Sequence, residues 1–172
     1  MKTAIFLRVS DLVSTLFTGK IERDRKFTKS KNPRADLMHN IMRTRSLGFQ
    51  EKELLVRLPK YLTRRTGNIY ITGVLDSLRV LRTKEGFVVS VVEYKTSRSG
   101  ELSPRRREAA KFQAQIYAWL LEKFLPKEYK IHRRHWVEFI DLFHPIVIER
   151  IPVEYDERIE ERIWEVVYRC LE

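Results

Sequence analysis

Three segments decide the fold of this 172-residue chain: IYITGVLDSLRV (69–80), GFVVSVVEYKTS (86–97) and REAAKFQAQIYAWLLEKF (107–124). The first two are rich in β-branched and aromatic residues, and the TKEG sequence between them is typical of a hairpin turn. The third repeats apolar residues with the period of a helix. We therefore expect two paired strands followed by a helix, with the first strand continuing over 69–82.

Charged residues of the expected hairpin fall on faces that are otherwise apolar. Alternation places Glu93 and Lys95 at the end of a strand face that also carries Val89 and Val91. In the preceding segment, Asp76 shares its expected face with Val74, Leu78 and Val80. Since a purely structural hairpin exposes its charges to water, this pattern indicates a functional site.

The chemistry of phosphodiester hydrolysis explains such a face. The reaction needs a divalent cation that neutralises the phosphate and lowers the pKa of the attacking water. Asp76 and Glu93 offer the carboxylate oxygens that Mg²⁺ prefers, and Lys95 can polarise the water or hold the scissile phosphate. The alternative is a cross-strand ion pair of these residues, which contributes little at a surface.

The helix after the basic loop has clear start signals, with Ser103 as N-cap and Pro104 in the first turn. Its expected apolar stripe consists of Ala109, Phe112, Ile116, Leu120 and Phe124. Gln113 and Tyr117 are four residues apart, so they project from one face of this helix. A glutamine can bind phosphate, metal-bound water or a base, and a tyrosine adds a hydroxyl and a stacking ring.

Composition favours a single globular domain with polyanionic partners. The chain has 34 Lys and Arg against 23 Asp and Glu, a net charge of +11, which attracts nucleic acid. A thermophile's charged surface would give a similar balance. The single cysteine, Cys170, excludes an internal disulfide, and the absence of a signal-like or membrane-length apolar run predicts a cytoplasmic protein.

Before these segments, helices are expected from Leu12, capped by Ser10 and Asp11, and from Pro33 to Gly48, with Leu37, Ile41 and Met42 buried. His39 lies near the edge of that apolar stripe, where a lone histidine is usually structural. The basic segment 20–34 is either a phosphate-contacting arm or a solvated charge run.

Around the central segments, a strand is expected over 51–59 and a basic turn over 61–68. Further strands over 132–141 and 146–153 precede a final helix that buries Ile159, Ile163, Val166 and Val167. We interpret His132, His135 and His144 as surface or turn residues, and Trp136 and Phe139 as packing residues.

These motifs, in this order, resemble a known family. Gly73 and Asp76 form a G-x-x-D motif, followed by EYK at 93–95 and QAQIY at 113–117. The set resembles the RecB-type branch, with its Q-x-x-x-Y motif, of the PD-(D/E)xK nuclease superfamily, including the CRISPR-associated RecB-like exonucleases. The resemblance implies an α/β (α+β) restriction-endonuclease-like core in which helices flank a central mixed β-sheet. One nuclease domain, 1–172, would comprise a helical part (1–50), the sheet and motif helix (51–153) and a C-terminal helix (154–172).

The resemblance also implies roles. His39, Asp76, Glu93 and the Tyr94 carbonyl would hold Mg²⁺ or Mn²⁺, and Lys95 would be the catalytic lysine. Gln113 and Tyr117 would position the DNA backbone or the site. Arg105, Arg106 and Arg107, at a helix start that favours anions, would bind nucleic acid with them.

Relatives of this kind often carry four cysteines around an iron–sulfur cluster, whereas this sequence has only Cys170, so we expect no cluster. The expected activity is a Mg²⁺- or Mn²⁺-dependent exonuclease acting on single-stranded DNA or DNA ends in repair, recombination or mobile-element replication. No nucleotide-binding P-loop is present, so a helicase or other repair partner would supply any motor. Two alternatives remain: a non-catalytic nucleic-acid-binding module on the same fold, and a structural protein with a charged surface.

Overall fold

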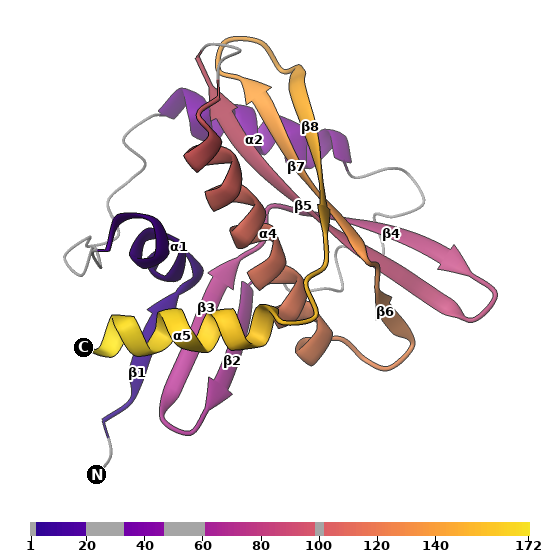
Figure 1. The fold of residues 1–172 in the computed structure, drawn as a ribbon. Helices are drawn as coiled ribbons and strands as arrows, with labels where there is room; N and C mark the ends of the chain where they lie inside the picture. Colours follow the sequence, from indigo (N-terminus) through magenta and orange to yellow (C-terminus); the bar gives the residue numbers. More distant parts are fainter. Residues whose placement is uncertain (1–2, 20–32, 47–60, 99–101) are drawn as a thin grey trace.

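The computed structural model describes residues 3–19, 33–46, 61–98 and 102–172, which form a mixed α+β fold (Figure 1). The elements in chain order are β1 (Ile5–Arg8), α1 (Val9–Thr18), α2 (Pro33–Ser46), β2 (Tyr61–Thr66), β3 (Ile69–Val74), β4 (Ser77–Thr83), β5 (Gly86–Ser97), α4 (Pro104–Phe124), β6 (Tyr129–Ile131), β7 (Arg134–Asp141), β8 (Val147–Glu154) and α5 (Ile159–Leu171). The expected fold class, a mixed sheet core flanked by helices, is confirmed. No helix among these residues is long and apolar enough to cross a membrane.

The strands form two sheets. The smaller has the order β1-β3-β2, with β1 parallel and β2 antiparallel to β3. The larger has the order β4-β5-β7-β8, and β6 pairs with the beginning of β5. Because β5 pairs antiparallel with β4 and parallel with β7, this sheet is mixed.

The expectation of one strand over 69–82 is wrong. β3 ends at Val74, where its pairing with β2 ends, and β4 begins at Ser77, which pairs with Val92 of β5. Val74 is therefore 51% exposed while Leu78 is buried, so the two do not share a face. The break leaves Asp76 at the junction of the two sheets.

The N-terminal half differs from the expectation in several places. Residues 61–66 form β2 rather than a turn, since Arg64 packs its guanidinium 4.2 Å from the centre of the Trp119 ring. A strand, β1, precedes α1, so the part over 1–50 is not wholly helical. The expected strand over 51–59 and basic segment over 20–32 lie outside the described residues.

Both N-terminal helices also depart in detail. α1 begins at Val9, and Asp11 caps it from inside the first turn by accepting a hydrogen bond of 2.8 Å from the Arg8 N–H. In α2, Met38 and Met42 are buried while Leu37 is 54% exposed, because the helix packs against Val92, Tyr94 and Ile140. α2 is described to Ser46, so its expected end at Gly48 lies outside the described residues.

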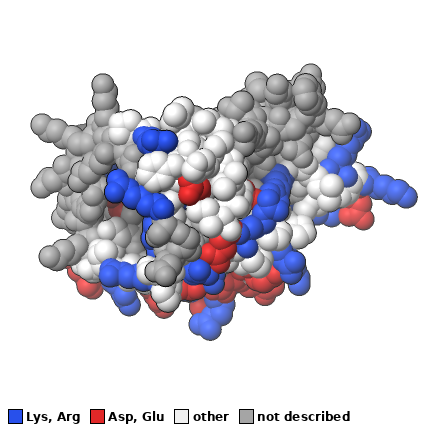
Figure 2. All heavy atoms as spheres, turned by 90° about the horizontal axis from the view of Figure 1, so that it is seen from above, with Lys and Arg blue, Asp and Glu red and all other residues white. Residues whose placement is uncertain are grey.

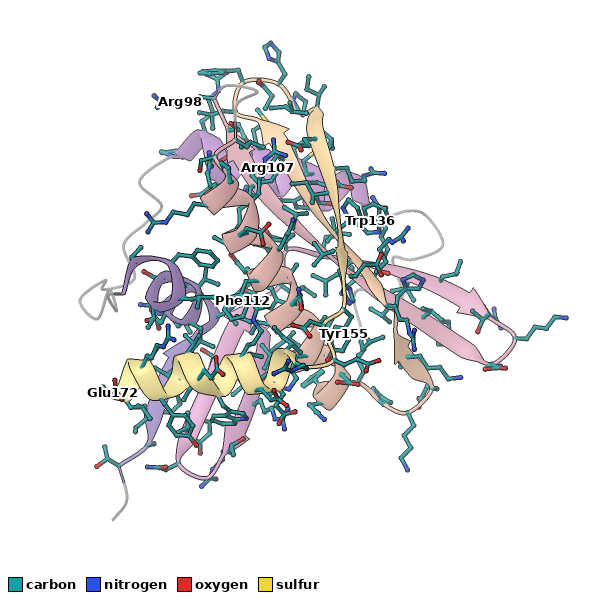
Figure 3. All side chains as sticks on the ribbon, viewed as in Figure 1. Arg98, Arg107, Phe112, Trp136, Tyr155 and Glu172 are labelled. Carbon is teal, nitrogen blue, oxygen red and sulfur yellow. The ribbon has the colours of Figure 1, made fainter. Side chains whose placement is uncertain are left out.

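The helix that carries the motif residues packs on one face of the larger sheet, and α2 lies on the other face (Figure 1). Ser103 caps α4 as expected, with Pro104 at its first turn. Of the expected stripe, Phe112, Ile116 and Leu120 are buried in the core, where Figure 3 labels Phe112, while Phe124 is 42% exposed. The four residues expected to face inward from α5 are buried.

His135 is a correction, because it is fully buried rather than at the surface. Its Nδ1 accepts a hydrogen bond of 3.0 Å from the Val91 N–H, at the gap in the ladder between β6 and β7. Burial, with a contribution from His132, lowers the pKa of His135 to about 4. His132 and His144 are exposed, as expected, and Phe139 is a core residue.

Candidate active site

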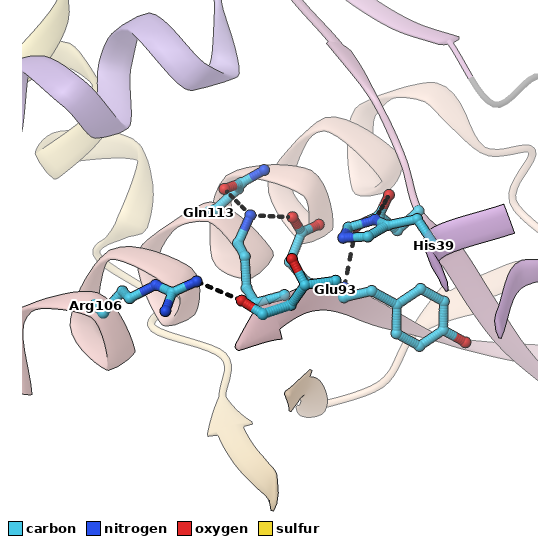
Figure 4. Close-up of polar contacts among 8 residues, drawn as sticks. His39, Glu93, Arg106 and Gln113 are labelled. Atoms are coloured by element: carbon cyan, nitrogen blue, oxygen red, sulfur yellow. Dashed lines mark hydrogen bonds and ion pairs between the residues drawn. The ribbon is translucent and has the colours of Figure 1, made fainter. Parts of the chain in front are cut away.

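The structure brings the predicted motif residues together at the junction of the two sheets (Figure 4). Lys95 Nζ lies 2.7 Å from Glu93 Oε1 and 2.8 Å from Gln113 Oε1. The lysine thus joins its own strand, β5, to α4. Alternation along β5 and the helical period of α4 together place these three side chains on facing surfaces.

Asp76 completes the group from the sheet junction. Its Oδ2 accepts a hydrogen bond of 3.0 Å from the Tyr94 N–H, and only 8% of the residue is exposed. Its Oδ1 lies 3.5 Å from His39 Nδ1. The helix α2 therefore does bring His39 to the site, with its ring edge-on to that of Tyr94.

Glu93 has an unusual electrostatic position. It is 2% exposed, and its Oε2 has no hydrogen-bond partner in the described part of the chain. Burial raises the pKa of Glu93 to about 8; the Lys95 ammonium opposes this rise and the Asp76 carboxyl adds to it. A buried carboxylate with an unpaired oxygen is costly unless a cation meets it.

Tyr117 does not have the exposed stacking ring that the sequence suggested. The residue is 4% exposed, and burial, with the Glu93 and Asp76 charges, raises the pKa of its hydroxyl. Hydrogen bonds from Gln113 and from the Val74 backbone to this hydroxyl oppose the rise. Tyr117 therefore connects α4 to the end of β3, close to Asp76, and its ring is not free to stack on a base.

The three arginines at the start of α4 point to different places. Arg106 donates to the Thr96 carbonyl, next to Lys95 (Figure 4). Arg105 donates to the Phe17 carbonyl of α1, and Arg107 pairs with Glu149 of β8 (Figure 3). Of the three, Arg106 is the one beside the strand that carries the lysine.

Sequence reasoning treated these arginines as equivalent, although a signal existed. Arg106 and Gln113 are seven residues apart, which is two helical turns and places both on one helix face. Figure 2 shows basic side chains at several places on the molecule, interspersed with acidic ones. Individual contacts therefore identify the useful arginine better than local charge density does.

The site was tested for its fit to a divalent cation. Within 3–19, 33–46, 61–98 and 102–172, no three histidine, cysteine, aspartate or glutamate side chains gather into a complete metal site. Magnesium, however, is commonly held by one or two carboxylates together with water and substrate phosphate. Asp76 and Glu93 supply that set, and the unpaired Glu93 Oε2 is the oxygen with a ligand still to find. The donor set therefore fits Mg²⁺ or Mn²⁺.

No protein-family model matches this sequence, and no curated protein matches it. Two solved structures share its architecture. One is the crystal structure of SSO0001, with a TM-score of 0.56, 16% identity, and coverage of 99% of this chain and 78% of that one. The other is a candidate exonuclease from Eubacterium rectale, with a TM-score of 0.55, 13% identity, and coverage of 96% and 79%. At these identities the likeness shows a common fold over nearly the whole chain.

Proposed function

We propose that this chain is a metal-dependent DNA nuclease of the RecB-like type, acting as an exonuclease on single strands or ends. The observation that carries the proposal is the group formed by Asp76, Glu93, Lys95 and Gln113, in which a buried carboxylate keeps one oxygen unpaired. The exonuclease name of the Eubacterium rectale protein, which shares the fold, supports the same conclusion.

A cation in this site would be held by Asp76 and Glu93, with His39 beside Asp76 and the Tyr94 carbonyl as a further oxygen. When bound, Mg²⁺ or Mn²⁺ supplies charge neutralisation of the phosphate and a more acidic water. Cation binding requires the ionised form of Glu93, which its raised pKa disfavours near neutrality, so binding releases a proton.

Lys95 then acts on the substrate directly. Its ammonium has three donors, and Glu93 and Gln113 accept two of them. The third is available to a non-bridging phosphate oxygen or to the attacking water. Gln113 fixes the direction of that donor, and Tyr117 fixes the end of β3. Arg106 lies where it can hold the next phosphate of the strand.

The test is cleavage of end-labelled DNA by the full chain, with Mg²⁺, Mn²⁺ or EDTA. Linear single strands, linear duplexes and circular single strands are compared, because only an exonuclease spares the circle. We expect metal-dependent degradation of linear DNA that Asp76→Ala and Lys95→Ala each reduce by at least about a hundredfold. Lys111→Ala, at a surface lysine of α4 paired with Glu108, is the matched control and should keep full activity.

Equal degradation by the wild type and Asp76→Ala would overturn the proposal. If neither protein cuts but both bind DNA, the chain is a binding module on a nuclease fold. RNA of the same sequence, run in parallel, shows whether the sugar is discriminated.

A further inference from the structure

A row of two aromatic rings and an arginine crosses the smaller sheet. Phe6 of β1 and Arg65 of β2 both pair in register with Tyr70 of β3. The rings of Phe6 and Tyr70 are stacked, with centres 4.7 Å apart and planes 14° apart. The Arg65 guanidinium lies 5.2 Å from the centre of the Tyr70 ring.

This row lies on the open face of the sheet. The opposite face carries Leu7, Leu62 and Ile71, all buried in the core under the helices. On the open face, Phe6 is 66% exposed and Arg65 is exposed as well. A phenylalanine with this exposure, stacked flat on a second ring, presents a π surface to solvent.

The charges of the face favour a polyanion. Alternation along the strands places Arg8, Thr63, Thr72 and Val74 on the same face as the row. No carboxylate belongs to this set of described residues. Arg8 pairs with Asp11, so Arg65 is the cation next to the rings. Its Nε donates to the Gly67 carbonyl at 2.8 Å, which orients the guanidinium before any ligand arrives.

The same strand leads into the candidate active site. β3 runs from Tyr70 to Val74, and Asp76 follows two residues later. Six residues of extended chain span about 20 Å. At roughly 3.4 Å per nucleotide, a strand with its end at Asp76 reaches Tyr70 after about six nucleotides.

We propose that Phe6, Tyr70 and Arg65 form a base-stacking platform for single-stranded nucleic acid whose end occupies the active site. The inference rests on the proposed function for the position of that end. Every base has a π face, and rings interleaved with arginine bind unpaired bases without sequence preference. Arg65 adds attraction to the backbone phosphates and to the π system.

The test is binding without cleavage, which keeps it separate from the nuclease assay. Fluorescein-labelled dT4 and dT12 are titrated with the full chain in EDTA, and fluorescence anisotropy gives the affinities. We expect Phe6→Ala to weaken dT12 about tenfold and Arg65→Gln about threefold. Neither change should alter dT4, which is too short to reach the row from the site.

Matched controls come from α5, where Tyr168 is 63% exposed and Arg169 is exposed beside it. Tyr168→Ala and Arg169→Gln remove the same kinds of side chain and should leave both affinities unchanged. Equal affinity of Phe6→Ala and the wild type for dT12 overturns the platform. A change in oligomeric state of Phe6→Ala, with unchanged dT12 binding, also overturns it and assigns the face to contact between copies. If dT12 binding depends on Phe6 but no DNA is cut under any metal, the platform stands and the nuclease proposal fails.

Discussion

A side chain at Gly73 would collide with Tyr117: an added Cβ would lie 2.6 Å from Cε1 of that tyrosine and 2.7 Å from a methyl of Val9. Real Cβ atoms essentially never come so close to other heavy atoms. The glycine of the G-x-x-D motif therefore has a steric role. It lets the ring of Tyr117 lie against β3, where the hydroxyl binds the Val74 backbone.

Gly73→Ala should be costly in both stability and activity. Because the ring and Val9 are packed in the core, the strand must shift, and we expect a loss of about 2 kcal/mol in the free energy of unfolding. A shift of β3 displaces Asp76, so the cleavage rate should fall as well. Urea denaturation of Gly73→Ala, Tyr117→Leu and the double variant measures the coupling. The glycine substitution should cost less when the tyrosine is gone, and an equal cost in both backgrounds would contradict this account.

Gln113 and Gln115 allow a matched comparison within one helix. Gln113 Oε1 accepts from Lys95, whereas Gln115 Oε1 accepts from the Asp156 N–H at 3.2 Å, away from the site. Gln113→Ala should lower kcat about 10- to 100-fold, because the catalytic lysine loses its orientation. Gln115→Ala should keep kcat and lose about 1 kcal/mol of stability. A similar effect of both changes on kcat would reduce Gln113 to a structural residue.

The site was largely predictable from the sequence because its encoding is local. Alternation along β5 aligned Glu93 with Lys95, and the four-residue spacing on α4 aligned Gln113 with Tyr117. The strand break before Ser77 was not predictable. No glycine or proline marks it, and it arises because β1 and β2 pair with the first half of the segment while β5 pairs with the second.

Long-range partners also decided the other failures. Arg105, Arg106 and Arg107 are equivalent in sequence, but α1, β5 and β8 each engage one of them. His135 appeared to be a surface residue because its two neighbours in sequence are arginines. Its burial depends on a gap between β6 and β7 that only the folded sheet contains.

His39 should control the cation requirement rather than the fold. Its Nδ1 lies 3.5 Å from Asp76 Oδ1, and its ring is partly accessible. His39→Ala should raise the Mn²⁺ concentration for half-maximal activity about tenfold, with little change in Tm. His144→Ala, which removes a histidine 3.1 Å from Asp141 at an exposed loop, is the control. Unchanged Mn²⁺ dependence of His39→Ala would remove this residue from the metal site.

Glu93 should make the metal-free protein less stable as the pH rises. Burial raises the pKa of Glu93 from 4.5 to about 8 in the folded state, so between these values the folded chain binds a proton that the unfolded chain releases. Stability from this group is complete below about pH 4.5 and is lost as the pH approaches 8, with a slope of at most about 1.4 kcal/mol per pH unit. Urea denaturation in EDTA between pH 5 and pH 8.5 measures the slope. Glu93→Gln, which cannot ionise, should remove this decline and be the more stable protein at pH 8. The same slope in both proteins would show that Glu93 is already ionised at neutral pH without a cation.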